Sequence, residues 1–286
     1  MAMSSKNWKN LCMSEQISHL EKGLPAPADA GVFGLSLSEL DSSLVIIPVG
    51  WEATASYGTG TSQTPQKIIK ASHQLDLFDL DFGEPYKKGI TLSNGLDGIY
   101  DLGKDVAKFV ELVRKSGENR SDQKEDALKK INQACEQVND LVYLKAKELL
   151  AAGKKVGLLG GDHSCPYGLI RALSEKYGEF AILHVDAHYD FREAYEGFKY
   201  SHASIMYNVM KDFNSAFKIY QIGIRDFSKQ EYDFQSELAA QGRALVHYSN
   251  DIFKGALNGN LEKMLEEMTD FLPDKVYISF DIDGLD

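Results

Sequence analysis

The sequence predicts an α/β protein: a mainly parallel sheet with helices on both faces, in three layers. Short apolar runs rich in Val, Ile, Leu and Phe recur along the second half of the chain, separated by segments with helical periodicity. Strands and helices that alternate in this way form βαβ units, whose crossovers cover both faces of a parallel sheet. Because the chain shows no internal repeat, low-complexity tract or linker, we predict one domain over residues 1–286.

The expected elements follow one another at short intervals. A first strand covers 43–49, and a Gly/Ser/Thr-rich stretch after it ends at Pro65, which suits the first turn of a helix over 66–72. Apolar residues at steps of three, four and seven predict a long helix over 121–152. Further strands are expected at 155–160, 180–185, 217–223, 244–248 and 275–280, and further helices near 166–177, 202–211, 228–240 and 260–271.

Composition limits the classes of partner. The formal net charge of −11 disfavours nucleic acid and anionic membranes, because both bind basic surfaces. The first residues lack the apolar segment of a signal peptide, and no later apolar run approaches membrane-spanning length. Three cysteines without a CxxC pair, Cys12, Cys135 and Cys165, indicate a reducing compartment. We therefore expect a cytoplasmic protein whose acidity keeps it in solution.

Polar clusters follow three of the expected strands. They read GDHS (161–164), DAHYD (186–190) and DIDGLD (281–286). The carboxyl ends of parallel strands lie on one rim of a sheet, so these side chains are expected to converge. Within the middle cluster, alternate residues of extended backbone project to the same side, which brings two carboxylates and an imidazole together. Such groups repel or stay unpaired unless a cation lies among them.

The clusters predict a site for two divalent metal ions and a hydrolase. Four carboxylates carry too much charge for one divalent ion and match two. Oxygen-rich ligation with some imidazole suits Mn²⁺, Fe²⁺, Ni²⁺ or Co²⁺, and a pair of such ions directs hydroxide at an electrophilic carbon or phosphorus. A lone Asp-x-Asp at a strand end is most often a turn or helix cap, whereas three such clusters favour metal. The candidate ligands are His163, Asp186, His188, Asp190, Asp281 and Asp283.

The same segments carry a family resemblance. GGDHS (160–164), DAHYD (186–190) and SFDIDGLD (279–286) resemble the three metal-binding signatures of the ureohydrolase family, and QIGIRDF (221–227) resembles one of its strands and turns. That family includes arginases, agmatinases, guanidinobutyrases and formimidoylglutamases. The resemblance implies an arginase/deacetylase-like fold and a dimetal hydrolase that converts a guanidino compound to urea and an amine or ammonia. It also implies manganese, with nickel as the alternative, and a homo-oligomer of trimer or hexamer type.

The resemblance also assigns roles to residues. One metal is held by residues matching His163, Asp186, Asp190 and Asp281, and the other by those matching His188, Asp186, Asp281 and Asp283. Asp186 and Asp281 therefore bridge the two metals, together with a hydroxide that attacks the guanidinium carbon. We predict two catalytic residues, Asp190 and His202. His202 matches a loop histidine that the family uses for proton transfer or substrate contact. The residue after this histidine is usually glycine in the family but is Ala203 in this chain. The alternative is therefore that His202 is an ordinary residue at the N-terminus of a helix, without a catalytic role.

The sequence defines substrate contacts less sharply. Trp51, Glu52 and Tyr57, in the loop 48–65, are candidates for a pocket wall. Arg192 would disfavour a dicationic substrate such as agmatine unless a nearby acid, Glu193 or Glu196, neutralises it. A surface ion pair is the reading we favour for Arg192. The loop 48–65 and the segment 196–208 resemble an agmatinase-like branch that contains guanidine hydrolases, so agmatinase-, guanidinase- and guanidinobutyrase-like substrates are all candidates.

The chain departs from the family at its end. Family members continue past the DxDxxD motif with proline, more strands and helices, and a glutamate that binds the guanidinium, whereas this sequence stops at Asp286. We therefore expect it to lack the family's C-terminal segment. The alternatives are a single-zinc, deacetylase-like amide hydrolase of the same fold, a dimetal phosphoesterase, and a metal-binding homologue without catalysis. The histidine of GGDHS and the Asp281/Asp283 pair favour two metals, and the GNHD motif of phosphoesterases is absent.

Overall fold

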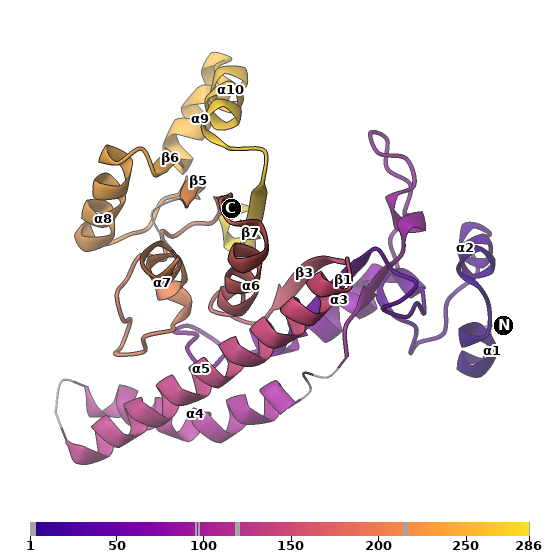
Figure 1. The fold of residues 1–286 in the computed structure, drawn as a ribbon, viewed down its shortest axis with the longest axis horizontal. Coiled ribbons are helices and arrows are strands. Elements are labelled where there is room, and N and C mark those ends of the chain that lie inside the picture. The colour runs from indigo at the N-terminus through magenta and orange to yellow at the C-terminus, as the bar shows by residue number, and fades with distance from the viewer. Residues whose placement is uncertain (1–3, 95, 97, 118–120, 214–216, 286) are drawn as a thin grey trace. The chain divides into compact units, whose positions relative to one another are not determined.

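The computed structural model describes residues 4–94, 96, 98–117, 121–213 and 217–285 (Figure 1). The chain divides into two compact units. The first contains residues 1–108 and 137–168, and the second contains residues 109–136 and 169–286. Each unit has its own parallel sheet and is considered by itself. The single domain predicted over 1–286 stays a prediction.

The first unit is built on three parallel strands in the order β2-β1-β3. Strand β1 (Leu44–Val49) lies between β2 (Ile90–Leu92) and β3 (Lys155–Gly160), with Leu44 opposite both Ile90 and Lys155. Along β1 every second side chain is fully buried, as expected for a strand with one face in the core. The helices of this unit are α1 (Ser5–Lys9), α2 (Met13–Glu21) and α3 (Thr64–Ser72).

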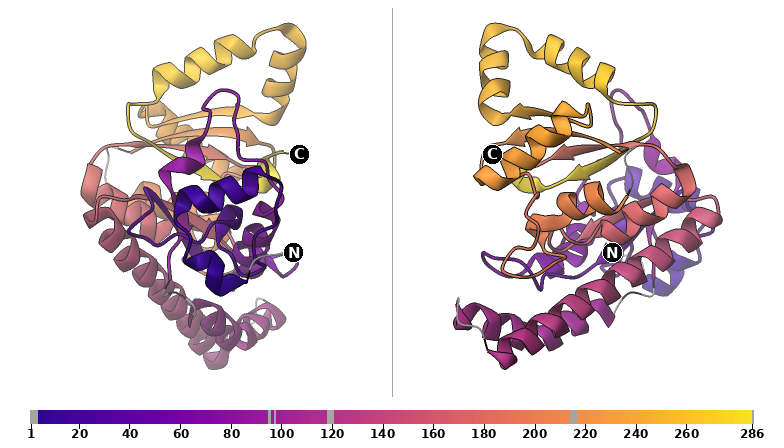
Figure 2. Two further views of the ribbon diagram at one scale, coloured as in Figure 1. Left: turned by 90° about the vertical axis from the view of Figure 1, so that its right-hand side faces the viewer. Right: turned by 60° about the vertical axis from the view of Figure 1, so that its left-hand side comes forward.

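The second unit is built on four parallel strands in the order β6-β5-β4-β7 (Figure 2). They are β4 (Ala181–Val185), β5 (Lys218–Ile224), β6 (Ala244–Tyr248) and β7 (Val276–Phe280). Its helices are α7 (Ile205–Asp212), α8 (Lys229–Ala240), α9 (Ser249–Asn258) and α10 (Leu261–Phe271). Helices α8 and α9 pack on β6, so each strand is joined to the next by a helical crossover of the expected kind.

Three helices contribute residues to both units. They are α4 (Gly98–Ser116), α5 (Asp122–Ala151) and α6 (Tyr167–Tyr177). Short 3₁₀ helices lie at Val32–Gly34, Thr61–Gln63, Pro85–Lys88, His202–Ser204 and Ile282–Leu285. Within the described part of the chain, every helix is too short or too polar to cross a membrane.

The predicted fold class, parallel strands with helices on both faces, is confirmed, and the six expected strands are all present within a residue or two. Several elements were not expected. Strand β2 has three residues, too few to show alternation. Helix α4 begins within a run containing Asp and three glycines, a composition typical of turns. Helix α9 leaves Phe253 and Leu257 mostly exposed, so its pattern does not mark a buried stripe.

Candidate metal centre

Three strand ends of the second unit meet around Asp186. In the sheet, His184 of β4 lies opposite Gln221 of β5 and Ser279 of β7, so β4 and β7 end at the same level and β5 ends two residues further on. Backbone hydrogen bonds continue the pairing past the strands: the N–H of Asp186 donates to the Ile222 carbonyl at 3.1 Å, and that of Asp281 to the Val185 carbonyl at 2.8 Å. The rim predicted from parallel strand ends is therefore present within this unit.

Two glycines let neighbouring loops approach the backbone of Asp186. A Cβ added at Gly223, which has φ of +95°, would lie 3.0 Å from the Asp186 carbonyl oxygen. A Cβ at Gly284 would lie 2.8 Å from the Asp186 nitrogen. Any other residue at these positions would push the loops apart, so the glycines set how closely the strand ends of β5 and β7 pack against Asp186.

Asp186 is a buried carboxylate, 1% exposed, whose two oxygens both accept hydrogen bonds. Its Oδ2 lies 2.8 Å from Nε2 of His184, and its Oδ1 accepts the backbone N–H of His188 at 2.7 Å. A carboxylate removed from water must be paired or bind a cation, because its desolvation is otherwise very unfavourable. These donors hold the carboxylate in one orientation.

The imidazole of His188 lies among three carboxylates. Its Nδ1 is 3.4 Å from Oδ1 of Asp186 and 3.3 Å from Oδ2 of Asp283, and its Nε2 is 3.9 Å from Oδ2 of Asp226. Hydrogen bonding to Asp186, and then to Asp283, raises the pKa of His188 to about 10. A site that binds a proton this firmly carries an excess of negative charge, which is the electrostatic condition for binding a divalent cation.

Asp190 lies on the loop after β4, where the backbone is not extended, contrary to the prediction from the sequence. It is 4% exposed and has φ of +56°, in the left-handed region that few residues other than glycine adopt. Its carbonyl accepts the N–H of Tyr207 at 3.1 Å, which ties the loop to the start of α7. Asp186, Asp190 and His184 offer ligand atoms within 4.8 Å of one another. Backbone strain of this kind is often found at functional sites.

The turn after β7 is fastened to the ends of β4 and β5. Asp283 accepts the N–H of Ala187 at 3.1 Å and donates its own N–H to Oδ1 of Asp281 at 3.2 Å. The guanidinium of Arg225 donates to the carbonyls of Asp283 and, at 3.2 Å, of Gly223. Asp283 is thereby brought to His188, whereas the carboxylate of Asp281 stabilises the turn; the bridging role predicted for Asp281 stays a prediction.

The donor set fits divalent metal. Asp186, His188 and Asp283 offer ligand atoms that all lie within 4.8 Å of one another. Carboxylate and imidazole donors suit Mn²⁺, Fe²⁺, Co²⁺ or Ni²⁺, and the buried carboxylate supplies charge that a cation would balance. The described residues of the second unit alone therefore form a His/Asp cluster suited to a metal ion.

His163 lies in the first unit, in the loop that follows β3. Gly161 sets the path of that loop, since a Cβ there would lie 1.8 Å from the Trp51 carbonyl oxygen. The buried carboxylate of Asp162 accepts hydrogen bonds from Oγ1 of Thr54 at 2.9 Å and from the N–H of Ser164 at 3.0 Å. The participation of His163 with ligands of the second unit stays a prediction.

The candidate pocket residues after β1 lie in three different environments. Trp51 is 1% exposed and belongs to the core, and Tyr57 is 98% exposed. The carboxylate of Glu52 accepts the N–H groups of Gly60 at 2.6 Å and Ser62 at 2.9 Å. Burial opposes ionisation of Glu52, but these hydrogen bonds outweigh it and lower its pKa. Glu52 thus shapes the glycine-rich loop, and a substrate role for these residues stays a prediction.

Arg192 is paired with a buried acid. Its Nε lies 3.5 Å from Oε2 of Glu231, which is 3% exposed, and its guanidinium stacks over the ring of Tyr195 at 5.1 Å. Glu231 also closes the capping box at the start of α8 with Ser228. Glu196, one of the acids expected to neutralise Arg192, instead pairs with Arg114 at 2.8 Å.

His202 opens the 3₁₀ helix His202–Ser204 in the second unit. Its ring meets that of Tyr195 edge to face, with centroids 5.7 Å apart and an interplanar angle of 84°. That contact restricts the orientation of the imidazole. The catalytic role of His202 stays a prediction.

Two residues of this centre, His184 and Asp226, were not predicted from the sequence. His184 is fully buried in β4 and bonded to Asp186, and Asp226 follows β5 with a side chain that is 85% exposed. Both carried a signal: a histidine in an otherwise apolar strand, and a fourth carboxylate directly after a parallel strand.

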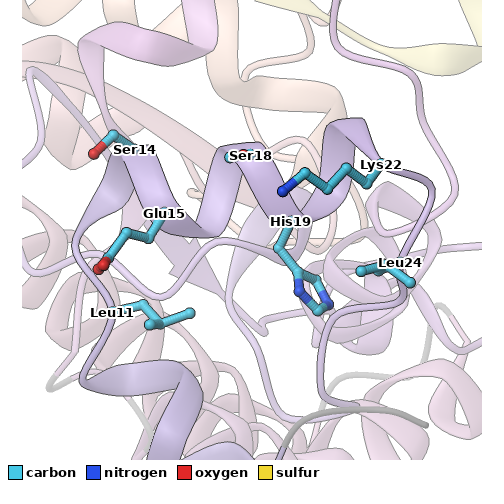
Figure 3. Close-up of a pocket in the computed structure, with 7 residues that line it drawn as sticks. All are labelled: Leu11, Ser14, Glu15, Ser18, His19, Lys22 and Leu24. Atoms are coloured by element: carbon cyan, nitrogen blue, oxygen red, sulfur yellow. The ribbon is translucent and has the colours of Figure 1, made fainter.

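The first unit has a separate surface hollow of about 380 Å³ beside α2 (Figure 3). None of the predicted site residues lines it. The lining residues are Leu11, Ser14, Glu15, Ser18, His19, Lys22 and Leu24.

Comparison with known proteins identifies the family. Residues 42–286 match the model described as the arginase family, which is most of the chain. The chain belongs to the arginase family. The predicted resemblance to ureohydrolases is confirmed, and so is the prediction of a hydrolase acting on a guanidino C–N bond at a two-metal site. This membership favours the ureohydrolase interpretation over the deacetylase-like and phosphoesterase alternatives, and the relatives named as ureohydrolase and agmatinase favour it over a homologue without catalysis.

Individual relatives agree with this assignment. An N(1)-aminopropylagmatine ureohydrolase of Thermus thermophilus is 28% identical over 247 residues, which cover 86% of this chain and 69% of that protein. An agmatinase of Bacillus anthracis is 34% identical over 51% of this chain and 46% of its own length. The crystal structure of an agmatine ureohydrolase of Thermoplasma volcanium superimposes with a TM-score of 0.63 at 24% identity, covering 94% of this chain and 75% of that one. This last similarity confirms the arginase-like fold.

Proposed function

We propose that this arginase-family chain hydrolyses an agmatine-type substrate, a guanidino compound with a second cationic amine, to urea and an amine. The observation that carries the proposal is the carboxylate of Asp226, which is 85% exposed, lies 3.9 Å from Nε2 of His188 and is not among the proposed metal ligands. An exposed carboxylate beside the metal centre attracts the cationic amine of a substrate and repels an anionic tail. The names of the relatives, agmatinase and aminopropylagmatine ureohydrolase, support the same substrate class.

Two further observations favour a dication. The whole chain carries a net charge of −11, which steers cations towards it. Arg192, the residue expected to repel a dication, has its charge balanced by the buried Glu231. Asp226 is the carboxylate best suited to the substrate's amine, because its side chain is 85% exposed and still lies beside His188.

We infer that the site takes two divalent ions, Mn²⁺ first and Ni²⁺ as the alternative. The chemistry they supply when bound is Lewis acidity, which lowers the pKa of water and stabilises negative charge in the transition state. The cluster of Asp186, His188 and Asp283 supports this inference through its donor types and its excess of negative charge. The residues proposed to hold the two ions are His163, Asp186, His188, Asp190, Asp281 and Asp283.

Protein side chains would move the protons of the reaction. The leaving amine needs a proton, and an imidazole is the side chain that exchanges protons most readily near neutral pH. His202, its ring restricted by Tyr195, is our candidate donor. Asp190, buried on the same loop as Asp186, is our candidate for orienting the attacking water.

Location and assembly are also proposals. A cytoplasmic setting is supported by the three cysteines, none of which forms a disulfide in the described structure. Neither nucleic acid nor membrane is proposed as a partner, because the chain is acidic. A homo-oligomer, trimer or hexamer, is supported by the family resemblance.

The deciding experiment measures urea release by protein loaded separately with Mn²⁺ and Ni²⁺, with metal content determined on the same samples. The substrates are agmatine, aminopropylagmatine, arginine, guanidinobutyrate and guanidine. The proposal expects the highest kcat/KM for a dicationic substrate. A preference for guanidinobutyrate or guanidine, with two ions bound, would overturn the substrate assignment and leave the hydrolase assignment intact.

A further inference from the structure

We propose that His184 is a positioning residue: as the neutral Nε2–H tautomer, set by Gln221, it orients the metal ligand Asp186. The inference rests on the proposed function only in treating Asp186 as a ligand. It assigns His184 a role as hydrogen-bond donor to a ligand, although its ring lies close enough to Asp186 and Asp190 to be taken for a ligand itself.

The starting observation is a row of polar residues inside the sheet. His184 and Gln221 are 0% exposed and Ser279 is 3% exposed, and the three lie side by side on β4, β5 and β7. Apolar residues normally fill such positions, because an unpaired polar group away from water is unfavourable. A fully buried histidine next to a glutamine therefore calls for a specific set of hydrogen bonds.

The contacts form a directed chain. Nε2 of Gln221 donates to the carbonyl oxygen of Tyr189 at 3.1 Å and lies 2.9 Å from Nδ1 of His184. On the other side of the ring, Nε2 of His184 lies 2.8 Å from Oδ2 of Asp186.

The tautomer follows from the carbonyl of Tyr189. A carbonyl oxygen only accepts, so the –NH₂ group of Gln221, and not its oxygen, must face it. The second hydrogen of that –NH₂ points to Nδ1 of His184, which must then carry a lone pair. The ring proton is left on Nε2, where it donates to Asp186. A change at Gln221 would thus be felt at Asp186 through the ring.

This arrangement excludes His184 as a ligand through Nε2, because that nitrogen carries a hydrogen. It also fixes Oδ2 of Asp186, while the backbone N–H of His188 fixes Oδ1. The plane of the carboxylate is therefore set from both sides before any metal binds. Partners that orient a ligand in this way change metal affinity by about 10–100-fold when they are removed.

The test compares the Mn²⁺ affinity of the full chain with that of three variants, by equilibrium dialysis with metal analysis. His184→Leu should weaken binding by about 10–100-fold. His184→Gln, whose amide can still donate to Asp186, should recover most of that loss. His247→Leu is the matched control, because His247 also bonds to two side chains, Tyr220 and Glu267, but on the opposite face of the same sheet. It should bind Mn²⁺ as the parent does.

Two outcomes would overturn the proposal. One is parent-like Mn²⁺ affinity in folded His184→Leu protein, and the other is equal losses in the Leu and Gln variants. If His184→Leu does not fold, Gln221→Met is measured in its place. A Gln221→Met variant with parent-like Mn²⁺ affinity and the parent tautomer of His184 would contradict the proposal.

Nitrogen-15 NMR of the imidazole rings tests the tautomer without metal or activity. The signal of His184 is assigned by its absence in His184→Gln, and it should report a proton on Nε2 and none on Nδ1. A proton on Nδ1 overturns the proposal. A parent chain that shows the expected tautomer but binds no Mn²⁺ would instead contradict the proposed function, so the two failures are distinguishable.

Discussion

The ends of β3 and β4 are each followed by a buried aspartate, Asp162 and Asp186, yet the two carboxylates are engaged differently. Asp162, after β3, accepts hydrogen bonds from the backbone and hydroxyl groups of Thr54 and Ser164, so its charge is balanced by neutral donors of nearby loops. Asp186, after β4, accepts from the ring of His184 and the backbone N–H of His188, and it faces a second carboxylate, Asp283, across the ring of His188.

The difference separates a structural carboxylate from a functional one. Neutral N–H and O–H donors stabilise an isolated anion and need no metal. Carboxylates that gather around one imidazole repel each other unless a cation lies among them. Burial alone does not distinguish the two cases, because Asp162 is 7% and Asp186 is 1% exposed.

The largest expected effect tests this contrast directly. Asp186→Asn removes a charge from the cluster and should lower urea release and Mn²⁺ content by more than about 100-fold, since even partners of ligands are worth 10–100-fold. Asp162→Asn should instead lower the free energy of unfolding by about 1–3 kcal/mol, with metal content per folded molecule retained. Chemical denaturation and metal analysis of both variants provide the measurements. If Asp186→Asn and Asp162→Asn lose the same amount of metal, the distinction between a functional Asp186 and a structural Asp162 is wrong.

The next effect concerns the glycine that lets β5 approach Asp186. Gly223→Ala should cost about 1–2 kcal/mol for its positive φ and a further 1–3 kcal/mol for the contact with the Asp186 carbonyl. Gly242→Ala is the control, because Gly242 also has a positive φ, +69°, with open space around the added Cβ among the described atoms. The control should lose stability from φ alone and keep its Mn²⁺ affinity. If Gly223→Ala and Gly242→Ala have the same denaturation midpoint, the close contact of Gly223 with Asp186 contributes nothing to stability.

A moderate effect is expected at Asp226, if this carboxylate recognises the substrate's amine. Asp226→Asn should raise KM for agmatine by about 2–5-fold, the size of a solvent-exposed charge interaction, and leave guanidine turnover nearly unchanged. Asp233→Asn, which removes an exposed carboxylate paired with Lys229 on α8, serves as the control. A uniform loss on both substrates would show that Asp226 acts on the metal centre instead.

The smallest effect compares two arginine–glutamate pairs. Arg192→Gln leaves Glu231 buried without its cation and should reduce stability by about 1–2 kcal/mol. Arg114→Gln breaks the pair with Glu196, whose side chain is 29% exposed, and should cost roughly 0.5 kcal/mol. Thermal unfolding of both variants at equal salt checks the order, and the reverse order would contradict the burial argument.

Sequence reasoning located the strands and most ligand candidates, but not every element or partner. The motif DAHYD identified Asp186, His188 and Asp190 as ligand candidates, but strand periodicity does not extend through it, because β4 ends at Val185 and Asp190 has a left-handed backbone with φ of +56°. His184 escaped notice because its importance lies in a cross-strand neighbour, Gln221, that is 37 residues away in sequence. Asp226 was missed for the same reason, since its link to His188 depends on the register between β4 and β5.

By itself, the sequence determined the class of fold, the family and the types of donor at the centre. Alternating apolar segments and closely spaced acidic motifs are local properties that periodicity translates into structure. Only the tertiary structure decided which carboxylate meets which partner: Arg192 pairs with Glu231, and Asp186 with His184. The physical reason is that pairing depends on strand register, loop closure and burial, which join residues far apart in the chain.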